Sequence, residues 1–233
     1  MTTQLPLFPL TTALVPGLVL PLHIFEPRYR MMVEELLAKP EDEREFGIVA
    51  VREHAAGVAT TGPQSRLPAG DMFPVGVTAQ LRQAERLDDG RYDIVAIGGR
   101  RFQIVDVDRS APLLRATVDF LPEPEVDASD PVVGLQAARA AAAFDKYRAA
   151  LGGRLAEERD EDEQVPSDPT VLGYLITAAL VVDASTRQEL LAAPDTIARL
   201  QSCTRILGQE TAMISALGAV PAIDLLQSNP SVN

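Results

Sequence analysis

The chain has 233 residues, 46% of them hydrophobic, and a formal net charge of −12 at pH 7. That hydrophobic share supports a packed core and excludes an intrinsically disordered chain. The negative charge disfavours nonspecific nucleic-acid binding, whose affinity comes largely from neutralising phosphates, and no apolar run approaches the ~20 residues of a membrane-spanning helix.

The N-terminal segment predicts two extended strands followed by a helix. Prolines punctuate residues 5–24, and each one removes a backbone donor and biases the preceding residue toward extended geometry. Such segments suit edge strands or barrel corners better than a helix. Pro27 then fits the first turn of a helix, where its missing N–H would be unpaired anyway. Apolar residues recur on one helical face: Tyr29, Met32, Val33, Leu36 and Leu37.

The rest of the first half is predicted to form short β-strands. Residues 46–51 make an apolar run of the strand type, and Asp89-Gly90 is a strong two-residue hairpin signal. Gly98-Gly99 is expected to separate two further strands. The remaining predicted strands are residues 77–87, 92–97, 102–107 and 114–121. A meander of short strands with turn signals is typical of a small barrel or sandwich.

A long loop is predicted from Ala55 to Pro74, because this stretch lacks periodicity and is rich in Gly, Pro, Ser and Thr. Loops beyond ~12–15 residues without structure tend to be functional or disordered. Met72 and Phe73 form an apolar pair in it, which either folds back as a plug or makes an exposed contact. We expect the contact, which makes Met72 and Phe73 candidate protein-binding residues.

The composition changes at residues 121–125, an acidic segment with two prolines that is typical of a domain boundary. We assign residues 1–122 to a β-rich domain and residues 123–233 to an α-helical domain. The second range is the more acidic one, with 17 Asp+Glu against 8 Lys+Arg.

Helix start signals recur through the second half. Asp130-Pro131 and Asp168-Pro169 each supply an N-cap followed by a first-turn proline, and Asp195 can cap a final helix. Ser185 and Gln188 have the spacing of a capping box. The second half is therefore predicted to be a set of helices.

The sequence lacks the motifs of common catalytic and metal sites. A Walker A loop needs a glycine-rich turn followed by a lysine, and neither lysine of the chain has that setting. His23, His54 and Cys203 cannot supply a structural zinc site at the usual spacing. We interpret His23 as a hydrogen-bonded structural histidine that Glu26 could orient, because no nucleophile can be named for it. We expect no catalytic residue, no metal site and no cofactor.

Three stretches resemble the Lon substrate-binding (Lon N-terminal) domain family. The segments PLFPL and PLHIFEPRYR are similar to its opening signature, LDDGRYDIVAIGGRRFQIVDV to its hairpin, and TRQELLAAPDTIARLQSCTRILGQE to its terminal helical segment. The resemblance covers about residues 4–217. The signature residues, which we expect to be structural, are His23, Phe25, Glu26, Arg28, Tyr29, Gly98, Arg101 and Phe102. An ion pair from Glu26 to Arg101 is one such structural role.

The resemblance implies an α+β fold, with an N-terminal β-rich PUA-like pseudo-barrel that includes one helix, followed by a C-terminal α-helical bundle. It also implies a noncatalytic polypeptide-binding module, a stand-alone form that acts as an adaptor or substrate-recognition factor in protein quality control. The full Lon protease has an ATPase module and a Ser–Lys dyad, and this chain lacks the length for either. The expected partners are a protein or unfolded polypeptide, with a protease or chaperone as a further partner, in the cytoplasm.

Two other functions compete with this one. PUA-like barrels include RNA readers, and an arginine cluster keeps an RNA-binding function open if it gathers on one surface: Arg82, Arg86, Arg91, Arg100 and Arg101. A peptidase function would rest on the family name alone. The sequence leaves the oligomeric state open.

Overall fold

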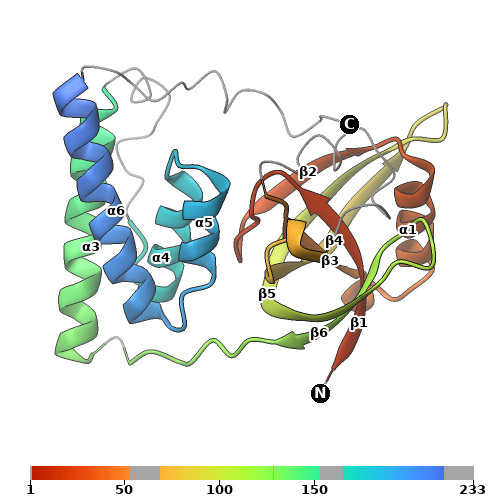
Figure 1. Ribbon diagram of the computed structural model, residues 1–233, viewed down its shortest axis with the longest axis horizontal. Helices are drawn as coiled ribbons and strands as arrows, with labels where there is room; N and C mark the ends of the chain where they lie inside the picture. The colour runs from red at the N-terminus through yellow and green to blue at the C-terminus, as the bar shows by residue number, and fades with distance from the viewer. Residues whose placement is uncertain (1, 53–68, 128, 153–164, 218–233) are drawn as a thin grey trace. The chain divides into compact units, whose positions relative to one another are not determined.

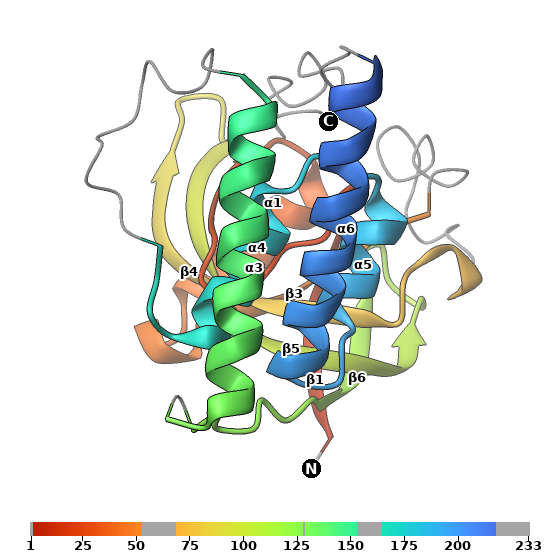
Figure 2. The same cartoon turned by 90° about the vertical axis from the view of Figure 1, so that its left-hand side faces the viewer.

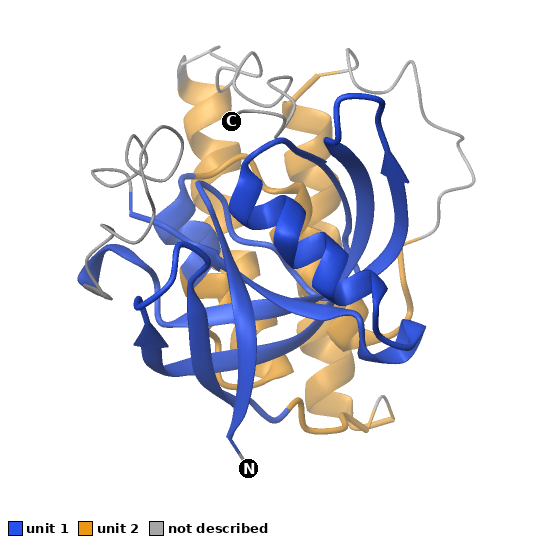
Figure 3. Ribbon diagram, turned by 90° about the vertical axis from the view of Figure 1, so that its right-hand side faces the viewer, with its two compact units in different colours: residues 1–122, 183–188, 228–233 blue, residues 123–182, 189–227 orange. Residues whose placement is uncertain are grey.

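The computed structural model describes residues 2–52, 69–127, 129–152 and 165–217 (Figure 1). The chain divides into two compact units. Unit 1 comprises residues 1–122 and 183–188, and unit 2 comprises most of the remaining chain (Figure 3). We expected a division into residues 1–122 and 123–233. In the structure, residues 183–188 also belong to unit 1.

The described part of unit 1 contains a mixed six-stranded sheet and the helix α1 (Pro27–Leu37). Pro27 occupies the first turn of α1 as predicted, and the helix buries Tyr29, Met32, Val33 and Leu36. The strands are β1 (Thr3–Leu10), β2 (Val19–Ile24), β3 (Glu45–Ala50), β4 (Val75–Arg86), β5 (Tyr92–Asp108) and β6 (Arg115–Phe120). Together with the helices of unit 2 they confirm an α+β fold.

Five of the strands pair in a closed ring. β1 is parallel to β3 and antiparallel to β6, while β3–β4, β4–β5 and β5–β6 are antiparallel pairs. β2 is not one of these five strands. It pairs with the first part of β5, residues 92–97, in the antiparallel direction. The apolar core of the ring contains Leu5, Leu7, Val49, Val51, Met72, Phe102, Leu114, Ala116 and Val118.

The β4–β5 hairpin confirms one prediction and corrects another. Gly90 has φ +81° in the turn between the strands, a conformation that favours glycine, as Asp89-Gly90 predicts. However, Gly98-Gly99 does not separate two strands, because β5 runs unbroken through both residues. A Cβ on Gly98 would overlap the carbonyl oxygen of Val15, so the glycine permits a close backbone approach and not a turn.

The described part of unit 2 contains three complete helices: α3 (Pro131–Ala150), α4 (Pro169–Ala179) and α6 (Thr196–Leu217). The three predicted N-caps are confirmed. Asp130 accepts a hydrogen bond from the backbone N–H of Val132 at 2.7 Å, Asp168 from that of Thr170 at 2.8 Å, and Asp195 from that of Ala198 at 2.8 Å. Each satisfies an N–H that has no partner within the first turn of its helix.

Helix α5 (Ala184–Leu191) begins differently from the prediction. Asp183, and not Ser185, accepts the hydrogen bond from the Thr186 backbone N–H, at 2.9 Å. Gln188 does not complete a capping box, because its side chain is buried and donates a hydrogen bond to the Val75 carbonyl at 2.7 Å. A tertiary hydrogen bond has replaced the local one that the spacing suggested.

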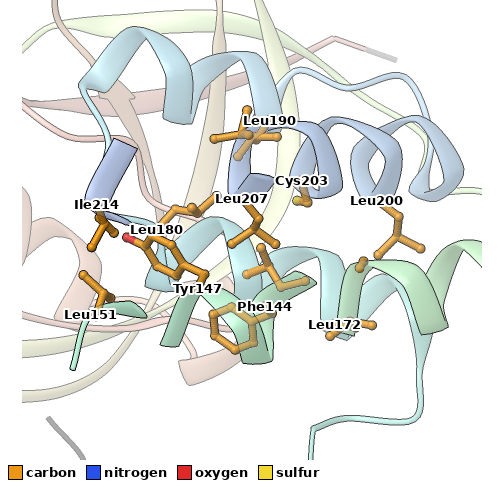
Figure 4. Packing of buried hydrophobic residues seen from close by; sticks show 13 residues of the cluster. Phe144, Tyr147, Leu151, Leu172, Leu180, Leu190, Leu200, Cys203, Leu207 and Ile214 are labelled. Carbon is orange, nitrogen blue, oxygen red and sulfur yellow. The ribbon is translucent and has the colours of Figure 1, made fainter. Parts of the chain in front are cut away.

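The core of unit 2 lies where α3 and α6 pack side by side and α4 packs against both (Figure 2). Aromatic and aliphatic side chains converge there, as Figure 4 shows: Phe144, Tyr147, Leu172, Leu180, Leu190, Leu200, Cys203 and Leu207. Cys203 is fully buried among them, so it behaves as a small core residue.

Candidate functional site

Half of the eight signature residues are buried in unit 1: Tyr29, Gly98, Arg101 and Phe102. Phe102 is fully buried in the ring core, and Tyr29 packs its ring 4.1 Å from the ring of Phe8. Arg101 is also buried, at 3% exposure, and donates a hydrogen bond to the Pro122 carbonyl at 3.3 Å. These positions hold the fold together and are not open to a ligand.

The structure does not pair Glu26 with Arg101, although this pairing was one structural role open to the two charges. Glu26 pairs with Arg28, two residues away, at the start of α1. The Arg28 guanidinium also lies 5.1 Å from the centre of the Tyr29 ring. Phe25 precedes this pair and is half-buried.

His23 is held by two charged residues that its sequence neighbourhood does not contain. Its Nδ1 lies 2.6 Å from Oδ1 of Asp93, the residue opposite it on β5. An Arg91 guanidinium nitrogen lies 2.9 Å from Nε2. Arginine only donates, so Nε2 accepts, and Nδ1–H donates to Asp93, as in a neutral imidazole. Asp93, and not Glu26, therefore orients His23.

A groove of about 640 Å³ lies over the outward face of β2, β5 and β4 beside His23. Alternate residues of the three strands point their side chains to this face. They are Pro21, His23, Gln83, Glu85, Asp93 and Val95. Its lining contains two carboxylates, Glu85 and Asp93, and no lysine or arginine. Arg91 lies beside His23, but it pairs with Asp89, so the groove is acidic.

The expected exposure of Met72 and Phe73 is wrong. Met72 is 4% exposed and Phe73 is 7% exposed, and the Phe73 backbone N–H donates to the Ala50 carbonyl at 2.9 Å. Met72 forms an isolated bridge with Val51, so the pair folds back as the plug. The two residues line the wall of a smaller cavity of about 250 Å³. Residues 55–68 of the predicted loop lie outside the described residues.

Of the five arginines that kept RNA binding open, Arg101 is buried and the other four are exposed. Arg91 pairs with Asp89 at 2.6 Å, and Arg100 lies 3.7 Å from the centre of the Phe120 ring. A phosphate-binding surface needs several cations that are free to reach the backbone of the nucleic acid.

A buried arginine in unit 2 had no sequence signal. Arg199 is fully buried and donates to Glu123 at 3.1 Å and to the Leu190 carbonyl at 3.3 Å. Its guanidinium lies 4.0 Å from the centre of the Tyr174 ring. Arg199 on α6 therefore fixes the segment that begins at Glu123 to the helices of unit 2. The contact with Glu123 appears only in the folded chain.

In the described ranges, no three His, Cys, Asp or Glu side chains gather in a group that could hold a metal ion. No helix in those ranges is both long and apolar enough to span a bilayer.

Comparisons with known proteins identify the family. The model of the ATP-dependent protease La (LON) substrate-binding domain matches residues 4–209. Lon protease 2 of Herpetosiphon aurantiacus is 26% identical over 214 residues, which are 90% of this chain and 24% of that protein. Lon protease 2 of Syntrophobacter fumaroxidans is 28% identical over 196 residues, 82% of this chain and 22% of that protein. The chain thus spans about a quarter of these relatives.

Solved structures share the fold. The Lon N-terminal domain protein from Xanthomonas campestris superposes with a TM-score of 0.60 at 22% identity, covering 88% of this chain and 98% of that one. The N-terminal domain of a Mycobacterium avium complex Lon protease superposes with a TM-score of 0.62 at 23% identity, covering 90% and 98%. With a family match that spans nearly its whole length, this chain belongs to the Lon substrate-binding domain family.

Proposed function

We propose that the chain is a noncatalytic polypeptide-binding module that acts as an adaptor or substrate-recognition factor in protein quality control. The observation that carries this proposal is the match of residues 4–209 to a substrate-binding domain. The sequence contains no Walker A loop and suggests no Ser–Lys dyad, which supports binding without catalysis. A protease or chaperone would be the further partner to which a bound polypeptide is delivered, in the cytoplasm.

The architecture supports a finer assignment within this proposal. The closed ring of β1, β3, β4, β5 and β6 would be the PUA-like pseudo-barrel, and the packed helices of unit 2 the helical bundle. Pro122 and Glu123 would then mark the boundary between two domains. Within unit 1, the groove beside His23 would receive the polypeptide.

Fluorescence anisotropy with a labelled unfolded protein tests the function. Reduced, carboxymethylated α-lactalbumin is the probe, and native α-lactalbumin is the matched control. We expect the chain to bind the unfolded form and not the native one. Equal binding of both forms, or binding of neither, would contradict the proposal. Labelled single-stranded RNA in the same assay tests the alternative, and we expect no binding to RNA at physiological salt.

A further inference from the structure

β2 is an edge strand with exposed apolar side chains. Among the residues that the structure describes, β5 is the only strand paired with it. Val19 is 56% exposed and Leu18, just before the strand, is 39% exposed. Natural proteins usually protect an open edge with charges or cover it, because a row of unpaired backbone groups is a template for another strand.

The register shows which backbone groups of β2 are open. The Leu18 carbonyl accepts a hydrogen bond from the Gly98 N–H at 2.9 Å, and Leu20 and Leu22 face Ala96 and Ile94 in the same register. Hydrogen-bonding groups alternate along an antiparallel pair. The backbone groups of Val19, Pro21 and His23 therefore point away from β5.

This outward edge can pair with an added strand. Pro21 has no N–H, but its carbonyl and both backbone groups of Val19 and His23 remain available. The N–H that Pro21 lacks would point away from β5. The proline therefore removes no hydrogen bond between β2 and β5. Strand addition of this kind binds an extended polypeptide through its main chain, and the neighbouring side chains set the preference.

The acidic groove lies on the same face as the outward side chains of this edge. Asp93 is one strand from β2, and Glu85 is one strand further. Strands are spaced by ~4.8 Å, so a lysine or arginine on an added strand beside His23 is long enough to reach Asp93 over β2. An apolar side chain four positions away would lie beside Val19.

We propose that the free edge of β2 binds an extended polypeptide segment by strand addition, and that it prefers a segment with an apolar and a basic residue four positions apart. This inference rests on the proposed function, because it names the site and the class of segment for the same binding activity. Main-chain pairing would supply affinity for many sequences, while Asp93 and Glu85 would favour basic ones.

The direct test uses a labelled synthetic peptide in which a valine and an arginine stand four positions apart among threonines. Two further peptides carry N-methyl groups on one or the other set of alternate amides. In strand addition only one set faces β2, so we expect one methylated peptide to lose binding and the other to keep it. We also expect the amides of Val19 and His23 to become protected from hydrogen exchange when the peptide binds.

Paired variants test the two side-chain contributions. Val19→Ser should weaken binding, whereas Val105→Ser should not, since Val105 has nearly the same exposure, 55%, and lies away from the edge, by the smaller cavity. Glu85→Gln/Asp93→Asn should weaken binding of the arginine peptide about tenfold, or ~1.4 kcal/mol, because the variant removes two carboxylates that attract the arginine. Asp106→Asn/Asp119→Asn makes the same change of net charge on exposed positions outside the groove and should have no effect.

The outcomes separate the site from the function. If unfolded α-lactalbumin binds while Val19→Ser equals its control and the Val19 and His23 amides stay unprotected, the edge assignment is wrong and the polypeptide-binding function stands. If neither the peptide nor the unfolded protein binds, both are wrong. A peptide whose arginine is replaced by glutamate should bind more weakly than the parent, and equal binding would overturn the basic preference.

Discussion

At the scale of single residues, Phe102 fits against two positions that lack a side chain. A Cβ on Gly47 would lie 3.0 Å from Phe102 Cζ, and a Cβ on Gly76 would overlap the same ring. The ring therefore fills space that these glycines leave open in the core. This arrangement gives a physical reason for a phenylalanine at this signature position.

Phe102→Ala and Phe25→Ala should differ in their effect on stability. Phe102 is fully buried, so its truncation should lower the free energy of unfolding by ~3–5 kcal/mol. Phe25 is half-buried, so its truncation should cost about half as much or less. Urea unfolding followed by circular dichroism measures both. An equal loss in the two variants would show that exposure does not decide the effect.

The Cys203 thiol should be unreactive in the native protein. Burial raises the pKa of this thiol from 9.0 to about 11, because the charged thiolate is poorly solvated in the core. The thiolate fraction at pH 7 should then be roughly a hundredfold lower than in the unfolded chain. Reaction with a chromogenic disulfide, measured with and without urea, checks this. Equal rates would show that the thiol is accessible in the fold.

At the scale of elements, Asp183 is the cap of α5, and its effect should depend on pH. The hydrogen bond from the Thr186 backbone N–H lowers the pKa of Asp183 below 3.8. The stabilisation is therefore present above about pH 3.8 and is lost as the pH falls through the lowered folded-state pKa. Asp183→Ala should cost ~1 kcal/mol at neutral pH, and the difference should shrink in acid.

Asp183→Asn is the matched control for this cap, because asparagine accepts the same hydrogen bond without titrating. It should keep most of the stability at neutral pH. Thermal unfolding of the parent and both variants across the acidic range measures the effect. A constant difference between the parent and Asp183→Ala at all pH values would contradict the assignment.

The segment around Met72 and Phe73 should behave as core. Met72→Ser/Phe73→Ser removes two buried side chains, so it should lower the free energy of unfolding by at least ~3 kcal/mol. Met31→Ser is the control, because Met31 is 58% exposed on α1. Differential scanning calorimetry measures both. A double variant that melts like the parent but loses a binding partner would restore the pair as a contact surface.

At the scale of the whole molecule, the chain should neither hydrolyse ATP nor cleave casein. ATP hydrolysis needs backbone amides and a lysine around the phosphates, and proteolysis needs an activated nucleophile, and the sequence has a motif for neither. Phosphate release and fluorescent casein assays on the recombinant chain measure these activities. Activity that remains with the chain through every purification step would contradict the noncatalytic proposal.

The sequence by itself determined the features that depend on near neighbours. The caps at Asp130, Asp168 and Asp195 each bond an N–H two or three residues away, so a short pattern specifies them. The turn at Gly90 and the buried face of α1 follow from the same kind of local rule. The family resemblance came from motifs of this length as well, and the match to residues 4–209 confirms it.

Only the tertiary structure decided the features that join distant residues. His23 meets Asp93, 70 residues away, because β2 pairs with β5, and no local pattern specifies that register. Gln188 bonds Val75 across 113 residues in place of the predicted capping box. The burial of Met72 and Phe73 likewise depends on the strand that receives them. Strand register and burial are set by the packing of the whole sheet, so they appear only once the chain has folded.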